Sequence, residues 1–165
     1  MMEIKTKRLE LKNPDSHNKK RLIELIGDKR VSEMLCGVPY PFTNQDADHT
    51  LKIINNSELK FSIFLNDVLV GGIGLSPKDT GYCELMYWIG FEYWGKGFAT
   101  ESCFGLFDHV KILTPHKKFK ALVYKGNTVS TKVLEKIGFK QMGDGEVFSI
   151  SKQENISCLN YEYFL

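Results

Sequence analysis

Residues 82–104 read YCELMYWIGFEYWGKGFATESCF, and this stretch guides the interpretation of the whole chain. Residues 82–89 are aromatic and aliphatic apart from one acid, Glu84, which is typical of a mostly buried strand. The small-residue segment at 94–101 follows after a short loop, and apolar residues then recur at helical spacing. The stretch predicts a strand, a glycine turn and a helix whose core-facing stripe is formed by Phe98, Phe104, Leu106, Phe107 and Val110.

The glycine turn is suited to binding an anion. Gly95, Gly97 and Ala99 let a phosphate approach the backbone, and free N–H groups and the positive dipole end at a helix start favour negative charge. Lys96 adds a full positive charge. The alternative is that the two glycines only form a turn before a helix. Two other nucleotide sites are excluded by spacing. The chain has no Walker GK(S/T), and Gly72 and Gly74 are not followed by the third glycine that a dinucleotide-binding fingerprint requires.

Composition predicts one globular domain spanning residues 1–165. The chain is 42% hydrophobic and 25% charged, and its net charge of +2 comes without a dense basic run. We therefore expect no nucleic-acid partner and, since no apolar run approaches about 18 residues, no membrane partner and a cytoplasmic location. The cysteines lack metal-ligand spacing, so we expect reduced thiols and no metal; they are Cys36, Cys83, Cys103 and Cys158.

The remaining elements predict an α+β fold with a mixed, mostly antiparallel sheet flanked by helices. The Asn66-Asp67 pair between two apolar runs predicts a hairpin. Glycines at 71, 72 and 74 imply a close neighbour or a bulge in its second strand. Expected helices cover residues 15–26, 30–36, 43–55, 97–113 and 128–137. Expected strands cover residues 4–11, 59–65, 68–75, 82–89, 119–124, 139–142, 146–151 and 157–164, with the strand at 119–124 parallel to that at 82–89.

Three motifs resemble one known family. The string YWIGFEYWGKGFATE resembles the acetyl-CoA loop of the GNAT acetyltransferases, whose pattern (Q/R)xxGx(G/A) falls on Trp94, Gly97 and Ala99, with Trp94 replacing Gln or Arg. Residues 127–139 resemble the GNAT segment NxxSxxVLEKxGF. The string TKRLELK at 6–12 resembles the opening TxRLxLR of the branch that contains the ribosomal-protein N-terminal acetyltransferases of the RimJ and RimL type.

The resemblance implies the GNAT acyl-CoA N-acyltransferase fold, with acetyl-CoA as cosubstrate and no metal. It further implies that two neighbouring strands diverge, so that backbone groups of residues 87–90 pair with the pantetheine arm as another strand would. By itself Asn127 is also a good helix N-cap. The cofactor-binding residues that the family resemblance implies are Trp88, Ile89, Trp94, Gly95, Lys96, Gly97, Phe98, Ala99, Thr100, Asn127, Ser130 and Lys132.

For transfer, the accepting amine must be neutral. At pH 7 a lysine-like amine is neutral roughly once in 10³ and an α-amine roughly one time in ten, so a base helps the first more. Glu84 is the candidate base, with Glu146 a weaker second, and the alternative for Glu84 is a solvent-facing or ion-paired strand acid. Ser130 is the candidate proton donor to the leaving thiolate, because Leu134 stands where many relatives carry tyrosine. We expect direct attack without an acyl-enzyme.

The segment GVPYPF at 37–42 cannot be helical, because its prolines remove donors and favour extended neighbours. In the GNAT fold this loop forms a wall of the acceptor site, which implies substrate contacts by Tyr40, Phe42 and Glu84. The alternative is that the two aromatics fill the core. The expected acceptor is a primary amine, either a protein N-terminal α-amine or a small molecule. A noncatalytic acyl-CoA-binding regulatory protein of the same fold is the alternative function, and we expect a monomer or homodimer.

Overall fold

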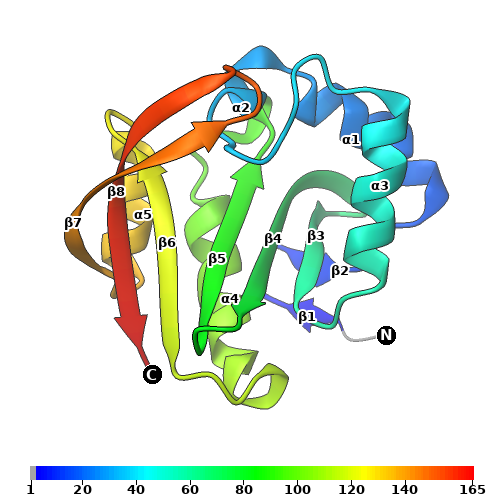
Figure 1. Ribbon diagram of the computed structural model, residues 1–165. Helices are drawn as coiled ribbons and strands as arrows, with labels where there is room; N and C mark the ends of the chain where they lie inside the picture. The colour runs from blue at the N-terminus through cyan, green and yellow to red at the C-terminus, as the bar shows by residue number, and fades with distance from the viewer. Residues whose placement is uncertain (1–2) are drawn as a thin grey trace.

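The structure is a computed structural model that describes residues 3–165, built on one eight-stranded sheet with the strand order β1-β2-β3-β4-β5-β6-β8-β7 (Figure 1). The strands are β1 (Ile4–Lys5), β2 (Glu10–Lys12), β3 (Lys60–Leu65), β4 (Val68–Lys78), β5 (Tyr82–Ile89), β6 (Lys118–Tyr124), β7 (Lys140–Ser149) and β8 (Glu154–Phe164). The helices are α1 (Lys19–Ile26), α2 (Lys29–Ser32), α3 (Asn44–Asn55), α4 (Phe98–Leu113) and α5 (Thr128–Lys136), with short 3-10 turns at Ser16–Asn18 and Phe91–Tyr93.

Two hydrophobic clusters lie on opposite faces of the sheet. The larger one joins the sheet to α4 and α5, with Leu106 and Leu134 fully buried. The smaller one joins α1 and α3 to β3 and β4. Side chains of β5 alternate between the two faces, so Leu85 belongs to the first cluster and Trp88 packs against the second. Figure 1 shows α4 and α5 behind the sheet.

The centre of the sheet contains its one parallel pair. Strands β5 and β6 are paired only through Cys83 with Phe119 and Glu84 with Lys120, whereas β5 continues to pair with β4 as far as Ile89. In Figure 1 the green β5 and the yellow β6 diverge beyond this point. We call the opening between residues 85–89 and 121–124 the wedge. The expectation of diverging strands is confirmed.

Several local predictions are confirmed. Asn66 and Asp67 both have positive φ, 48° and 62°, as the predicted two-residue hairpin turn requires. The register of β3 with β4 shifts at Ile63/Phe64, which is the expected irregularity, and the indole of Trp88 covers Gly72. A Cβ at Gly72 would come within 2.6 Å of Trp88 Nε1, so glycine permits this close packing.

The bounds of three sets of predicted elements and one core assignment were wrong. The predicted strand at 4–11 is two short antiparallel strands, because the hydroxyl and N–H of Thr6 turn the chain by bonding to the Leu9 carbonyl. The second helix ends at Ser32 in place of residue 36. The predicted strands at 139–142 and 146–151 form the single strand β7, with a register shift between Gln141 and Gly143. Phe104 is 45% exposed, so it does not belong to the core-facing stripe of α4.

Candidate active site

The wedge is the central feature of the site because its backbone is unpaired on one side. Leu85 through Ile89 have no partner in β6, so their β6-facing backbone groups, apart from the Ile89 carbonyl that accepts from the Trp94 indole, are free to bind an extended, amide-containing ligand. Pantetheine has this chemistry. The side chain of Trp88 lies on the α1 and α3 face over Gly72, and its backbone pairs with Gly72 in β4, so its predicted contact with the cofactor stays a prediction.

The glycine loop lies between β5 and α4. Gly97 is the N-cap of α4 with φ +77°, and no side chain caps the helix, in contrast to α3 and α5, which Thr43 and Asn127 cap. Phe98 is buried, and Ala99 and Thr100 follow in the first turn. The first N–H groups of α4 are therefore available to an anion, together with the positive end of a 16-residue helix.

Trp94 and Lys96 have roles that the sequence did not indicate. The indole of Trp94 donates a hydrogen bond of 2.6 Å to the Ile89 carbonyl, which ties the loop to the end of β5. The ammonium of Lys96 lies 5.1 Å from the centre of the Tyr93 ring. Trp94 thus fixes the loop conformation, and it adds no charge where the family pattern has Gln or Arg.

Tyr87 and Ser130 meet across the wedge. The Tyr87 hydroxyl lies 2.7 Å from Ser130 Oγ and also donates to the Ser130 carbonyl oxygen at 3.2 Å. Burial raises the pKa of the Tyr87 phenol, although its hydrogen bond to Ser130 acts in the opposite direction. Tyr87 is therefore a protonated hydrogen-bond partner of Ser130 at neutral pH.

Asn127 places Ser130 in the first turn of α5. Its side-chain oxygen accepts a hydrogen bond of 3.1 Å from the Ser130 N–H, as expected of an N-cap. Leu134 is fully buried, so the position where relatives carry tyrosine belongs to the core here. Lys132 is exposed one turn after Thr128, and its predicted contact with a coenzyme phosphate stays a prediction.

Glu84 lies where β5 and β6 begin to diverge, since its pairing with Lys120 is the last in the register. Its side chain is 23% exposed, and its carboxylate is paired with the Lys78 ammonium at 2.7 Å. The hydrogen bond between the Lys78 ammonium and the Glu84 carboxylate raises the pKa of Lys78. Glu84 is thus at the vertex of the wedge, on the face opposite Tyr87. Glu146 is exposed on the edge strand β7, which β8 and β6 separate from β5.

The cysteines near the wedge are poorly suited to nucleophilic catalysis. Cys83 and Cys103 are fully buried, and burial raises the pKa of both thiols. All four cysteines are free. Because the thiolate is the reactive species, this environment agrees with direct transfer.

The proline-rich loop separates its two aromatic residues. Phe42 is 7% exposed and packs in the smaller cluster with Leu22, Leu51 and Leu69, which corresponds to the alternative of an aromatic that fills the core. The predicted contact of Phe42 with an acceptor stays a prediction. Tyr40 is 43% exposed and lies 5.9 Å from the Lys29 ammonium.

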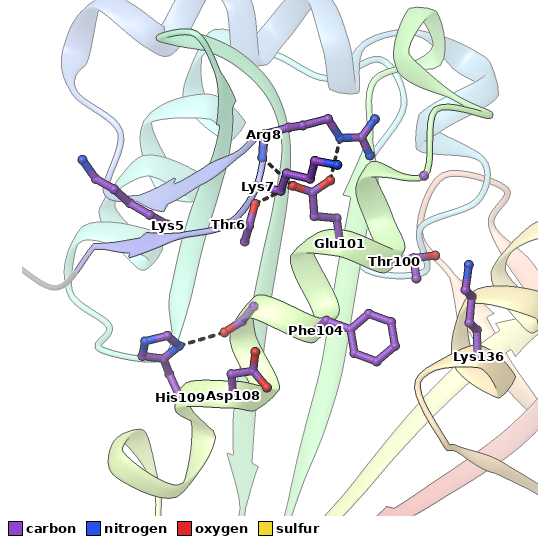
Figure 2. Close-up of a pocket in the computed structure, with 12 residues that line it drawn as sticks. Lys5, Thr6, Lys7, Arg8, Thr100, Glu101, Phe104, Asp108, His109 and Lys136 are labelled. Carbon is purple, nitrogen blue, oxygen red and sulfur yellow. Dashed lines mark hydrogen bonds and ion pairs between the residues drawn. The ribbon is translucent and has the colours of Figure 1, made fainter.

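An open groove of about 520 Å³ runs along the outer side of α4, beside the glycine loop (Figure 2). Gly97 and Thr100 form one end, the exposed ring of Phe104 lies in its middle, and Lys136 reaches it from α5. Its charged residues are Lys5, Lys7, Arg8, Lys136, Glu101 and Asp108. Cations outnumber acids among them, which favours an anionic ligand.

Two of these features were missed from the sequence. Strand alternation from the buried Leu85 would have placed the Tyr87 side chain on the α4 and α5 face, but the contact with Ser130 depends on the fold. No local pattern brings Arg8 to the glycine loop. The ion pair of Glu84 was one of its stated alternatives, and the β4–β5 hairpin supplies Lys78 as the partner. Among residues 3–165, no cluster of metal-binding side chains is present and no helix is long and apolar enough to cross a membrane.

Comparisons with known proteins agree with this geometry. Residues 8–140 match the family of the acetyltransferase (GNAT) domain. An uncharacterized N-acetyltransferase p20 from Bacillus licheniformis is 28% identical over 152 residues, which cover 87% of this chain and 85% of the relative.

Solved structures share the fold. The GNAT-family acetyltransferase from Bacillus anthracis aligns with a TM-score of 0.86 at 21% identity, covering 99% of this chain and 98% of that chain. RimL, a ribosomal α-N-protein acetyltransferase in complex with coenzyme A, aligns with a TM-score of 0.85 at 15% identity over the same shares. The eight-stranded sheet with its single diverging parallel pair, the uncapped helix after a glycine loop and the family match lead to one conclusion: this chain belongs to the GNAT acetyltransferase family, and acetyl-CoA is its cosubstrate.

Proposed function

We propose that this enzyme is an N-acetyltransferase that moves the acetyl group of acetyl-CoA to a primary amine by direct attack. The wedge carries the proposal, because it brings a free strand edge, the Ser130 hydroxyl and the Glu84 carboxylate to one opening in the sheet. Bound acetyl-CoA supplies the activated acetyl group. The first amides of α4 and Lys96 would hold its diphosphate, and the backbone of residues 87–89 its pantetheine arm.

Two side chains would move protons. The Glu84 carboxylate would accept a proton from the incoming ammonium at the vertex of the wedge, once its pairing with Lys78 loosens. The Ser130 hydroxyl would donate a proton to the sulfur as the carbon–sulfur bond breaks, and the proton that the attacking nitrogen loses after the attack would pass through solvent to restore the hydroxyl. Tyr87 fixes the direction of that hydroxyl. General acid–base transfer of this kind contributes about 10² to 10⁴ in rate, and positioning in the wedge supplies the other large contribution.

The acceptor is proposed to be an amine that is not a polycation. A polycation such as a polyamine needs a cluster of unpaired acids, but the acids of the N-terminal helices already have partners. Asp28 is bonded to Arg30, Asp48 to Lys19 and Glu33 to Lys29, while Asp46 caps α3 with Thr43. This pairing of the acids supports a protein N-terminal α-amine or a small amine of single charge as the acceptor.

A cytoplasmic location stays a prediction.

One experiment tests this function directly. The chain is incubated with isotope-labelled acetyl-CoA, together with peptides of varied N-terminal residue, free amino acids and polyamines, and the products are identified by mass spectrometry while thiol release is followed. Labelled acetyl on an α-amine or small amine with matching thiol release supports the proposal. Tight acetyl-CoA binding by calorimetry with no thiol release for any amine would favour the noncatalytic acyl-CoA-binding alternative.

A further inference from the structure

Arg8 lies beside the glycine loop although it belongs to the turn between β1 and β2. Its guanidinium carbon lies 4.7 Å from the centre of the Phe98 ring, and its Nη2 lies 3.6 Å from the point that a Cβ at Gly97 would occupy. Figure 2 shows the guanidinium extending from the turn toward the start of α4. The most N-terminal hairpin of the chain therefore brings a cation to the loop that precedes α4.

This cation is held in place through one edge only. Arg8 Nε donates to Glu101 Oε2 at 2.7 Å, while the Arg8 backbone N–H and the Thr6 hydroxyl donate to Glu101 Oε1, each at 2.7 Å. Glu101 is 16% exposed, so the carboxylate is a firm anchor. The Nη1 and Nη2 atoms of the guanidinium, the second of them beside Gly97, make no hydrogen bond within residues 3–165, so the edge that they form remains available to a ligand.

The Glu101 contact also removes an electrostatic obstacle. Glu101 is in the first turn of α4, where its negative charge would repel a phosphate at the helix start. Burial opposes ionisation of Glu101, but hydrogen bonds from Thr6 and Arg8 outweigh it and hold the pKa of the carboxyl below its usual range. Arg8 neutralises this permanent charge, so the pair leaves the loop receptive to anions.

The loop itself has a corresponding deficiency. Its first position is Trp94, whose indole donates to the Ile89 carbonyl and carries no charge, so Lys96 is the single cationic side chain of residues 94–100. We propose that Arg8 binds the diphosphate of acetyl-CoA and supplies, from the β1–β2 turn, the cationic side chain that position 94 lacks. The proposal rests on the coenzyme site described above. A guanidinium suits the task because it can bond a carboxylate with one edge and a phosphate with another.

The experiment compares two acetyl donors on one set of variants. S-acetylpantetheine has the thioester and the pantetheine amides of acetyl-CoA but no phosphate. In Arg8→Gln, the KM for acetyl-CoA is expected to rise about 10- to 100-fold, while the KM for S-acetylpantetheine changes less than about twofold. Arg8→Lys should show an intermediate loss, because an ammonium cannot contact Glu101 and a phosphate with separate edges.

Two controls make the outcome decisive. Lys140→Gln removes an exposed cation on the edge strand β7, outside the groove, and should leave both KM values unchanged. Turnover of S-acetylpantetheine by Arg8→Gln shows that the variant is folded. A third donor, 3′-dephospho-acetyl-CoA, should show the same loss as acetyl-CoA.

Three results would overturn the assignment. An equal rise for acetyl-CoA and S-acetylpantetheine would make Arg8 a structural residue, and no rise for either would remove it from the site. A loss that disappears with 3′-dephospho-acetyl-CoA would move Arg8 to the 3′-phosphate. Failure of the coenzyme site itself is distinguishable, because the unaltered enzyme would then use acetyl-CoA and S-acetylpantetheine with the same KM.

Discussion

The Tyr87 hydroxyl lies 2.7 Å from Ser130 Oγ and joins β5 to α5 across the open end of the wedge. The same hydroxyl also donates to the Ser130 carbonyl oxygen at 3.2 Å, and within residues 3–165 no other side chain makes a hydrogen bond between these two elements. Tyr87 is mostly buried, and burial raises the pKa of its phenol, so it keeps its proton throughout the range in which amines are acetylated. The pair is a preformed hydrogen-bonded unit, and the proposed function requires the coenzyme sulfur to lie beside it.

Replacing Tyr87 by phenylalanine should therefore slow turnover without weakening coenzyme binding. Loss of one hydrogen bond worth about 1 kcal/mol predicts a roughly fivefold lower kcat, with the KM for acetyl-CoA unchanged. Ser130→Ala should lower kcat about tenfold or more. Steady-state thiol release measures both. If Tyr87 acts through Ser130, the double variant should be no slower than Ser130→Ala, and simple multiplication of the two effects would contradict this.

Glu84→Gln should remove the proposed base while keeping the side-chain volume. We expect kcat to fall by about 10² or more, with the largest loss at acidic pH, where little of the acceptor is already neutral. The measurement is kcat/KM against pH. Lys78→Gln is the matched control because it breaks the same 2.7 Å ion pair and leaves the carboxylate in place. A Glu84→Gln profile parallel to that of the unaltered enzyme would remove Glu84 as the base.

Gly97→Glu should abolish acetyl-CoA binding. The new carboxylate would lie at the helix start where the diphosphate is expected, and a side chain at φ +77° adds strain of about 1 to 2 kcal/mol. Gly81→Glu is the control, since Gly81 has φ +83° with open space around it in the β4–β5 turn. Calorimetry should show unchanged binding for Gly81→Glu. Tight binding by Gly97→Glu would contradict the loop assignment.

Glu101→Gln should destabilise the fold in a pH-dependent way. The carboxylate accepts three hydrogen bonds that hold the β1–β2 turn against α4, so the free energy of unfolding at pH 7 should fall by about 1 to 3 kcal/mol. The folded pKa lies below the ordinary 4.5, so this stability is present above pH 4.5 and is lost as pH falls through the folded pKa. Urea unfolding between pH 7 and pH 3 should show the two proteins converging.

Glu135→Gln provides the comparison for that experiment. Glu135 is an exposed helix acid on α5 without a hydrogen-bonded partner among its neighbours in the described chain, so its loss should change the free energy of unfolding by less than about 0.5 kcal/mol. An equal effect of both substitutions would show that the Glu101 contacts contribute nothing specific.

Local chemistry in the sequence determined much of this protein. Period-two alternation and turn residues located the hairpin at Asn66 and Asp67, glycines located the loop before α4, and Asn127 located the start of α5, because each depends on near neighbours in the chain. The motifs around Trp94, Gly97 and Ser130 added the family and its cosubstrate, which the comparisons bear out.

Only the tertiary structure decided which side chains meet. Phe104 faces the groove and not the core as expected, and Phe42 packs in the core, which was one of its two possible surroundings, because helical and loop patterns do not specify a neighbour. The contacts of Arg8 with Glu101 and of Tyr87 with Ser130 join residues 93 and 43 positions apart. Such contacts depend on the order of strands in the sheet and on where β5 and β6 separate, and no short stretch of sequence contains that information.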